Sequence, residues 1–148
     1  MRRWLVLLGI VTCQAEAQTA SPLQPQPQTR WFTVTGNPLD AGVDTVQVDP
    51  VATKVEGTFK TMNVRVSRAG QRFNWENLPY RSYESKVVFD CRARKAGYVF
   101  ATFYPEPLWQ GAPSASTDYS SKPQPMLFRD VEPNPTHRII RAACQASG

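Results

Sequence analysis

The chain has three cysteines, and their positions constrain its fold more than any other feature of the sequence. Cys13 lies in an N-terminal stretch with a basic start, a short apolar run and small residues at its end, which is typical of a secretory signal peptide over residues 1–17. Its cleavage leaves Cys91 and Cys144 in an oxidising compartment, where two thiols normally pair. We therefore predict a structural disulfide between them that stabilises the fold by about 4 kcal/mol in the chain-entropy estimate.

The predicted leader indicates an exported protein, held in the periplasm or at the outer membrane and cell surface. Its apolar run is shorter than the roughly 20 residues of a membrane-spanning helix, so we expect no transmembrane segment. Acylation of Cys13 is an alternative, although the bulky Thr12 before it disfavours a lipid anchor. Residues 18–30 are rich in Pro and Gln and predict a disordered spacer, which leaves residues 31–148 as one domain.

From Trp31 onward, apolar and polar residues alternate with a period of two, which is typical of half-buried strands. The clearest run has Met62, Val64 and Val66 on one face. A turn at residues 94–97 predicts a hairpin between the last two runs. The predicted strands cover residues 31–35, 45–48, 61–67, 83–92 and 98–104, with a further short one within 51–55.

The segment from Pro105 to Pro135 has closely spaced prolines that exclude a long regular element. Only residues 126–128 are apolar enough to predict a short edge strand within it. A terminal helix follows, because Asn134 can cap it and Pro135 fits its first position. The apolar face of this helix is predicted to contain Ile139, Ile140, Ala143 and Cys144.

The predicted disulfide determines where this helix packs. Cys91 shares a strand face with Val87 and Phe89, while Cys144 lies on the apolar face of the helix. Joining the two cysteines places the apolar side of the helix on the apolar side of the sheet. The sequence therefore predicts an α+β fold, with an antiparallel β-sheet and a C-terminal helix packed on one face.

The sequence shows no signature of a common catalytic site. His137 is the single histidine, both remaining cysteines belong to the predicted disulfide, and no hydrolase, zinc-protease or phosphate-loop motif occurs. We therefore predict no cofactor, no metal and no enzymatic activity. A small periplasmic hydrolase that uses two carboxylates is the remaining catalytic alternative, although no pair of acids is singled out.

The candidate binding residues are five cations: Arg65, Lys86, Arg92, Arg94 and Lys95. The first three project from the polar faces of predicted strands, and the last two lie at the hairpin turn. With a formal net charge of +5, such a patch favours a protein or polyanionic partner in the envelope or outside the cell. The alternative is a solvated sheet face whose charges keep the protein soluble. Export argues against nucleic acid as a partner, and a homodimer stays open.

The run from Tyr80 to Cys91, followed by basic residues, resembles the surface-adhesin protein E-like domain family. Members of that family have a Trp-led first strand, as at Trp31, and a Val-Asp-Pro step, as at residues 48–50. An alternating strand like residues 62–66 comes next, and a last cysteine, here Cys144, lies near the end. The order of these features extends the resemblance over nearly the whole predicted domain.

The resemblance implies an antiparallel sheet with a packed helix, in agreement with the pattern of the residues. It also implies a location in the cell envelope and attachment to extracellular-matrix proteins. We therefore expect a non-enzymatic exported binding module, with a periplasmic scaffold or assembly protein as the alternative.

Overall fold

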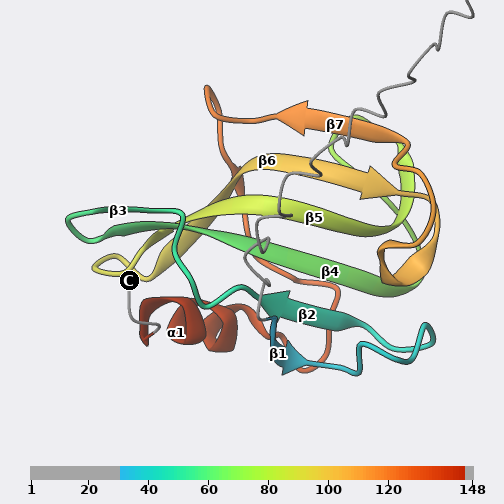
Figure 1. Cartoon of the computed structure of the whole chain (residues 1–148), viewed down its shortest axis with the longest axis horizontal. Coiled ribbons are helices and arrows are strands. Elements are labelled where there is room, and N and C mark those ends of the chain that lie inside the picture. The colour runs from blue at the N-terminus through green and yellow to red at the C-terminus, as the bar shows by residue number, and fades with distance from the viewer. Residues whose placement is uncertain (1–30, 146–148) are drawn as a thin grey trace, which may run out of the picture.

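The computed structural model describes residues 31–145, so the predicted signal peptide and spacer lie outside the described residues. An eight-stranded antiparallel sheet forms the body of the domain, and its main path follows the order β1-β2-β4-β5-β6-β7 (Figure 1). β3 pairs with β4, and β8 pairs with β6. The strands are β1 (Phe32–Thr35), β2 (Thr45–Val48), β3 (Lys54–Glu56), β4 (Phe59–Phe73), β5 (Pro79–Asp90), β6 (Lys95–Tyr104), β7 (Ala115–Asp118) and β8 (Gln124–Pro125).

The long hairpin of β4 and β5 forms the centre of the sheet, and it confirms the period-two prediction. Met62, Val64 and Val66 of β4 are fully buried, as are Val87 and Phe89 of β5. The polar residues between them point to the opposite face of the sheet, because successive strand residues alternate sides. The pattern therefore separates a core face from an open face.

The turn after β5 begins earlier than predicted. The Asp90 carboxylate accepts hydrogen bonds from the backbone N–H groups of Arg92 and Ala93, at 3.1 and 2.9 Å. Arg94 then adopts a left-handed φ of 53°, and β6 starts at Lys95. An aspartate that caps the turn thus shortens the loop and extends the hairpin.

The proline-rich segment differs from its prediction. The expected strand at 126–128 is wrong, because the chain leaves the sheet after the N–H of Met126 donates to the Ala96 carbonyl at 3.0 Å. Met126 and Phe128 pack into the core instead. The four-residue strand of this segment is β7, which has no apolar alternation and forms by pairing with β6.

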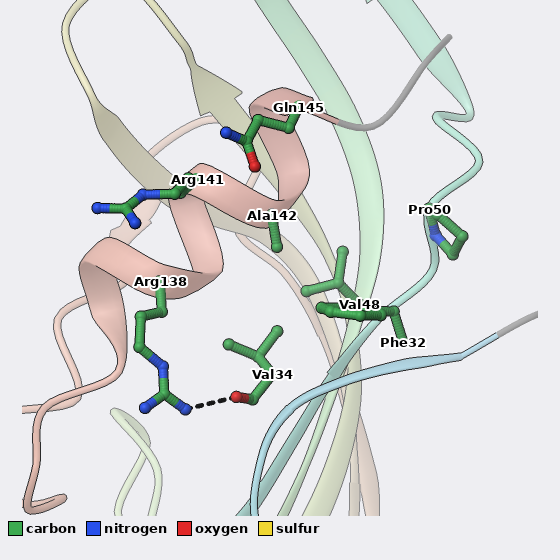
Figure 2. Close-up of a pocket in the computed structure, with 8 residues that line it drawn as sticks. All are labelled: Phe32, Val34, Val48, Pro50, Arg138, Arg141, Ala142 and Gln145. Atoms are coloured by element: carbon green, nitrogen blue, oxygen red, sulfur yellow. Dashed lines mark hydrogen bonds between the residues drawn. The ribbon is translucent and has the colours of Figure 1, made fainter.

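The terminal helix α1 (Thr136–Gln145) begins and packs as predicted. The Asn134 side chain accepts a hydrogen bond from the N–H of Thr136 at 2.9 Å, which satisfies one of the free donors of the first turn. Arg138 donates to the carbonyl of Val34 on β1, so α1 lies beside the β1–β2 edge (Figure 2). Cys91 and Cys144 form the predicted disulfide, with their Cα atoms 5.6 Å apart. The buried residues of the helix are Ile139, Ile140 and Ala143.

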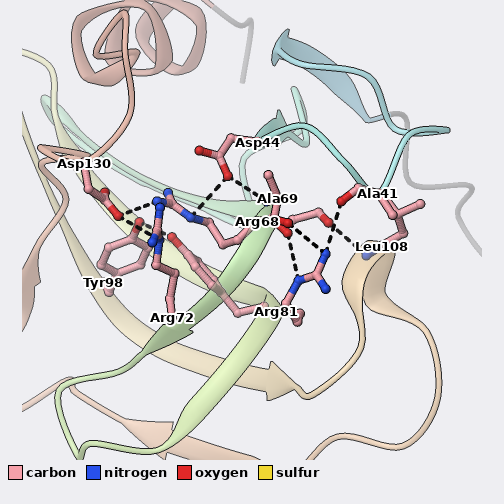
Figure 3. Close-up of polar contacts among 11 residues, drawn as sticks. Ala41, Asp44, Arg68, Ala69, Arg72, Arg81, Tyr98, Leu108 and Asp130 are labelled. Carbon is pink, nitrogen blue, oxygen red and sulfur yellow. Dashed lines mark hydrogen bonds and ion pairs between the residues drawn. The ribbon is translucent and has the colours of Figure 1, made fainter.

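A buried arginine fixes the proline-rich segment to the end of the sheet (Figure 3). The Arg68 side chain is only 3 % exposed, and it forms ion pairs with Asp44 at 3.5 Å and with Asp130. Arg72 reaches the same Asp130 carboxylate at 3.2 Å. Because a buried charge is costly without a partner, these carboxylates are what allows a guanidinium to occupy the interior.

Candidate binding face

The open face of the sheet carries a row of polar residues that crosses all six strands of the main path. The strand registers place each residue of the row directly opposite the next one. The row consists of Thr33, Gln47, Arg65, Glu84, Thr102 and Ser116. Side-chain hydrogen bonds join three of the five neighbouring pairs: Thr33 with Gln47, Gln47 with Arg65, and Thr102 with Ser116.

Arg65 is the most constrained residue of this row. Its Nε donates a hydrogen bond to the Gln47 side chain at 2.7 Å, and Gln47 in turn donates to the Thr33 hydroxyl at 2.9 Å. The guanidinium lies against two indole rings, with its central carbon 4.3 Å from the ring centre of Trp31 and 4.0 Å from that of Trp109. Each cation–π contact contributes roughly 0.5–1 kcal/mol at an exposed site, so the cation is held in one orientation.

Trp109 reaches Arg65 because the short helix η1 (Pro107–Trp109) is anchored over the open face. Ser67 and Ser82 accept hydrogen bonds from the backbone N–H groups of Leu108 and Trp109, at 2.9 and 3.0 Å. The indole N–H of Trp109 donates to the carbonyl of Tyr83 at 3.0 Å.

This segment is also strained. Leu108 and Trp109 have left-handed φ values of 54° and 58°. Such a conformation costs on the order of 1–3 kcal/mol at a residue other than glycine. The serine anchors hold the strained backbone in place, and backbone strain of this kind concentrates at functional sites.

A cavity of about 530 Å³ opens beside Arg65. Partial burial lowers the pKa of Arg65, and the neighbouring Glu84 carboxylate opposes that shift. Glu84 also accepts a hydrogen bond from the Tyr104 hydroxyl at 3.2 Å. Arg65 itself lines this cavity, and within residues 31–145 no hydrogen bond is found from either of its Nη groups. The remaining lining residues are Trp31, Asn63, Ser85, Lys86, Phe100 and Thr102.

The structure divides the five predicted cations between two places. Arg65 and Lys86 line the same cavity on the open face. Lys95 lies opposite Asp90 in the strand register, at the far end of the hairpin. Asp90 is six residues along β5 from Glu84, which corresponds to roughly 20 Å in a strand. Arg92 and Arg94 belong to the turn before Lys95, and Arg94 lines a different cavity together with His137 of α1.

Two residues of the site lie outside the five predicted cations. Trp31 was interpreted as the start of a strand, and Trp109 belongs to the proline-rich segment. No local pattern connects residues 31, 65 and 109, which meet only through the strand register and the anchored helix η1. A tryptophan beside several prolines was the one available sign that this segment packs on the sheet.

The part of the chain that the structure describes offers no metal centre. It contains no group of three or more His, Cys, Asp or Glu residues that could hold a metal ion. Nor does any helix in residues 31–145 have the length and apolar character needed to cross a membrane.

Comparison with known proteins gives one match. The family model of surface-adhesin protein E matches residues 31–145. No curated protein and no solved structure is significantly similar to the chain.

Proposed function

The chain belongs to the surface-adhesin protein E family, and from this membership we propose that it is an exported envelope module that acts by binding a polyanionic partner, and not by catalysis. The disulfide supports export, because such bonds persist in oxidising compartments. The proposal includes the signal peptide over residues 1–17, the spacer over residues 18–30 and a location in the periplasm or at the cell surface.

We propose that the ligand contacts the domain at Arg65. The observation that carries this proposal is the guanidinium held between Trp31 and Trp109, with its Nε bound to Gln47. A guanidinium can donate two parallel hydrogen bonds to a carboxylate, sulfate or phosphate group, and that of Arg65 lines a cavity large enough to admit one. Because the surrounding contacts already fix the side chain, little conformational entropy is lost when an anion binds.

The surroundings of Arg65 favour an extended anionic sugar. Lys86 adds a second cation to the cavity, while Glu84 offsets one charge and limits binding of small, isolated anions. Asn63 and Thr102 offer neutral polar groups of the kind that bind hydroxyls, and Phe100, which is 36 % exposed, offers an apolar surface. A sulfated or uronic-acid polysaccharide offers a matching partner for each of these: anionic groups, hydroxyls and the apolar faces of its sugar rings. Acidic stretches of an extracellular protein offer only the anionic groups.

Binding to a heparin oligosaccharide, measured by isothermal titration calorimetry, tests this site. Arg65→Lys keeps the charge but loses the two-pronged donor, so we expect at least a tenfold loss of affinity. That loss corresponds to the roughly 1.5–3 kcal/mol of a hydrogen bond to a charged group. Lys86→Gln is expected to weaken binding about threefold, because Lys86 acts as a charge at the edge of the site.

Arg92→Gln is the matched control, since it removes a full charge from the hairpin turn, away from Arg65. We expect it to change the affinity less than twofold. If Arg92→Gln weakened binding as much as Arg65→Lys, attraction would come from the overall charge of the domain and the proposed site would be wrong. The melting temperature of each variant establishes that the fold is retained.

A further inference from the structure

A groove separates α1 from the β1–β2 edge, on the core side of the sheet and therefore away from Arg65 (Figure 2). Its volume is about 480 Å³, which lies within the range of small-molecule sites. Phe32 and Val34 of β1, Val48 of β2 and Pro50 form the sheet side, and Ala142 faces them from the helix. Arg138, Arg141 and Gln145 complete the lining, so the sheet side of the groove is apolar and its polar side chains come from the helix.

The groove exists because the helix offers only a small side chain at this point. Ile139, Ile140 and Ala143 are the buried residues of α1, while Ala142 remains partly exposed beside the groove. Opposite it, Phe32 is 56 % exposed although it lies on the core side of its strand. An aromatic ring left in water at a concave apolar surface is a place where a ligand gains free energy by covering it.

The charges around the groove are of one sign. Arg138 and Arg141 are its only ionisable lining residues, and they lie one helical turn apart. The sequence of α1 contains no Asp or Glu. Figure 2 shows Arg138 beside Val34, at the N-terminal end of the helix, while Arg141 is directed away from the groove. The positive end of the helix dipole adds to the potential near Arg138.

We propose that this groove binds a fatty acid. The acyl chain lies between Ala142 and the apolar residues Phe32, Val48 and Pro50, and the carboxylate lies at the end of the groove beside Arg138. Charge complementarity selects this ligand, because an apolar groove with Arg138 at one end and no acidic lining residue is suited to a molecule with one apolar chain and one anionic group. A neutral apolar molecule would bring no anionic group to Arg138, and a short anion would leave Phe32 exposed.

Titration of the disulfide-bonded domain with dodecanoate, below the concentration at which it self-associates, tests the proposal. We expect micromolar binding of dodecanoate and no measurable binding of butyrate, which has the carboxylate but not the chain. Ala142→Trp fills the groove and should weaken binding at least tenfold, whereas Arg138→Gln should weaken it roughly threefold to tenfold. Ala142→Leu is a milder filling variant, to be used if the tryptophan variant does not keep the wild-type melting temperature.

Arg92→Gln is again the control for charge and should change the affinity less than twofold. Unchanged binding by both Ala142 variants would show that dodecanoate binds elsewhere, and it would overturn the proposal. Sedimentation with vesicles containing an anionic phospholipid distinguishes binding of a free fatty acid from binding of a lipid bilayer. If an Ala142 variant reduced vesicle binding but not dodecanoate binding, the groove would engage membrane lipid and the assignment to a fatty acid would be wrong. Neither result bears on heparin binding at Arg65.

Discussion

Removal of the disulfide is the perturbation whose size follows most directly from the structure. Cys91 and Cys144 are 53 residues apart in the sequence. For a loop of that length, the chain-entropy relation gives about 14 cal/mol/K, or about 4 kcal/mol at 25 °C. Both cysteines are only partly buried, so the variant Cys91→Ser/Cys144→Ser loses little apolar burial besides. We therefore expect the free energy of unfolding to fall by about 4 kcal/mol, a large share of the roughly 5–15 kcal/mol that stabilises a domain.

Urea denaturation of the two proteins, followed by far-UV circular dichroism, measures this difference. Hydrogen exchange shows which part of the fold loses stability, because α1 is attached to the sheet by the disulfide and by a small set of buried side chains. In the serine variant we expect the amides of α1 to exchange faster relative to those of β4 and β5. The groove should lose affinity for dodecanoate at the same time, since α1 forms one of its walls. A loss of less than about 1 kcal/mol, with the wild-type disulfide verified as intact, would refute the chain-entropy reasoning.

The tyrosines of the core give two further predictions. The hydroxyls of Tyr83 and Tyr98 are buried and lie 2.7 Å apart. Tyr98→Phe should lower the free energy of unfolding by about 1–3 kcal/mol, because it leaves the Tyr83 hydroxyl unpaired. Changing both tyrosines to Phe should cost less than the sum of the two single changes. Urea denaturation of the single and double variants measures these losses of stability, and a double variant whose loss equals the sum of the single losses would contradict the prediction. Burial also raises the pKa of both residues, and it raises the pKa of Tyr119 to about 12. The unfolded chain ionises its tyrosines near pH 10 while the folded chain does not, so stability should be insensitive to these groups below about pH 10. Above that pH it should fall by up to about 1.4 kcal/mol per pH unit for each of Tyr83 and Tyr98. Absorbance at 295 nm should show them ionising only as the protein unfolds, and titration near pH 10 in the folded protein would contradict the assignment.

Several elements could be predicted because their signals are local. The strands β4 and β5 follow from alternation over neighbouring residues, and the helix α1 follows from Asn134, Pro135 and one apolar face. Such signals work because side-chain direction is set by the backbone of the same segment. The disulfide could be predicted for a different reason: the expected cleavage of a signal peptide would remove Cys13 and leave one possible pair of cysteines.

Elements that lack a local signal were missed. β7 has a polar sequence and becomes a strand only because β6 offers it unpaired backbone groups. Arg68 is buried against its usual preference, because Asp44 and Asp130 reach it from distant parts of the chain. Neither outcome can be read from neighbouring residues.

The sequence by itself determined the sheet with its terminal helix, the disulfide that joins them and the family to which the chain belongs. Only the tertiary structure decided which of the five cations lie together. Arg65 gains its orientation from Trp31 and Trp109, which are brought to it by strand register and by a strained turn. The groove beside α1 likewise depends on the distance between the helix and the β1–β2 edge. Pattern and composition reveal which way a side chain faces, but the identity of its neighbours across the sheet is set by packing over long sequence separations.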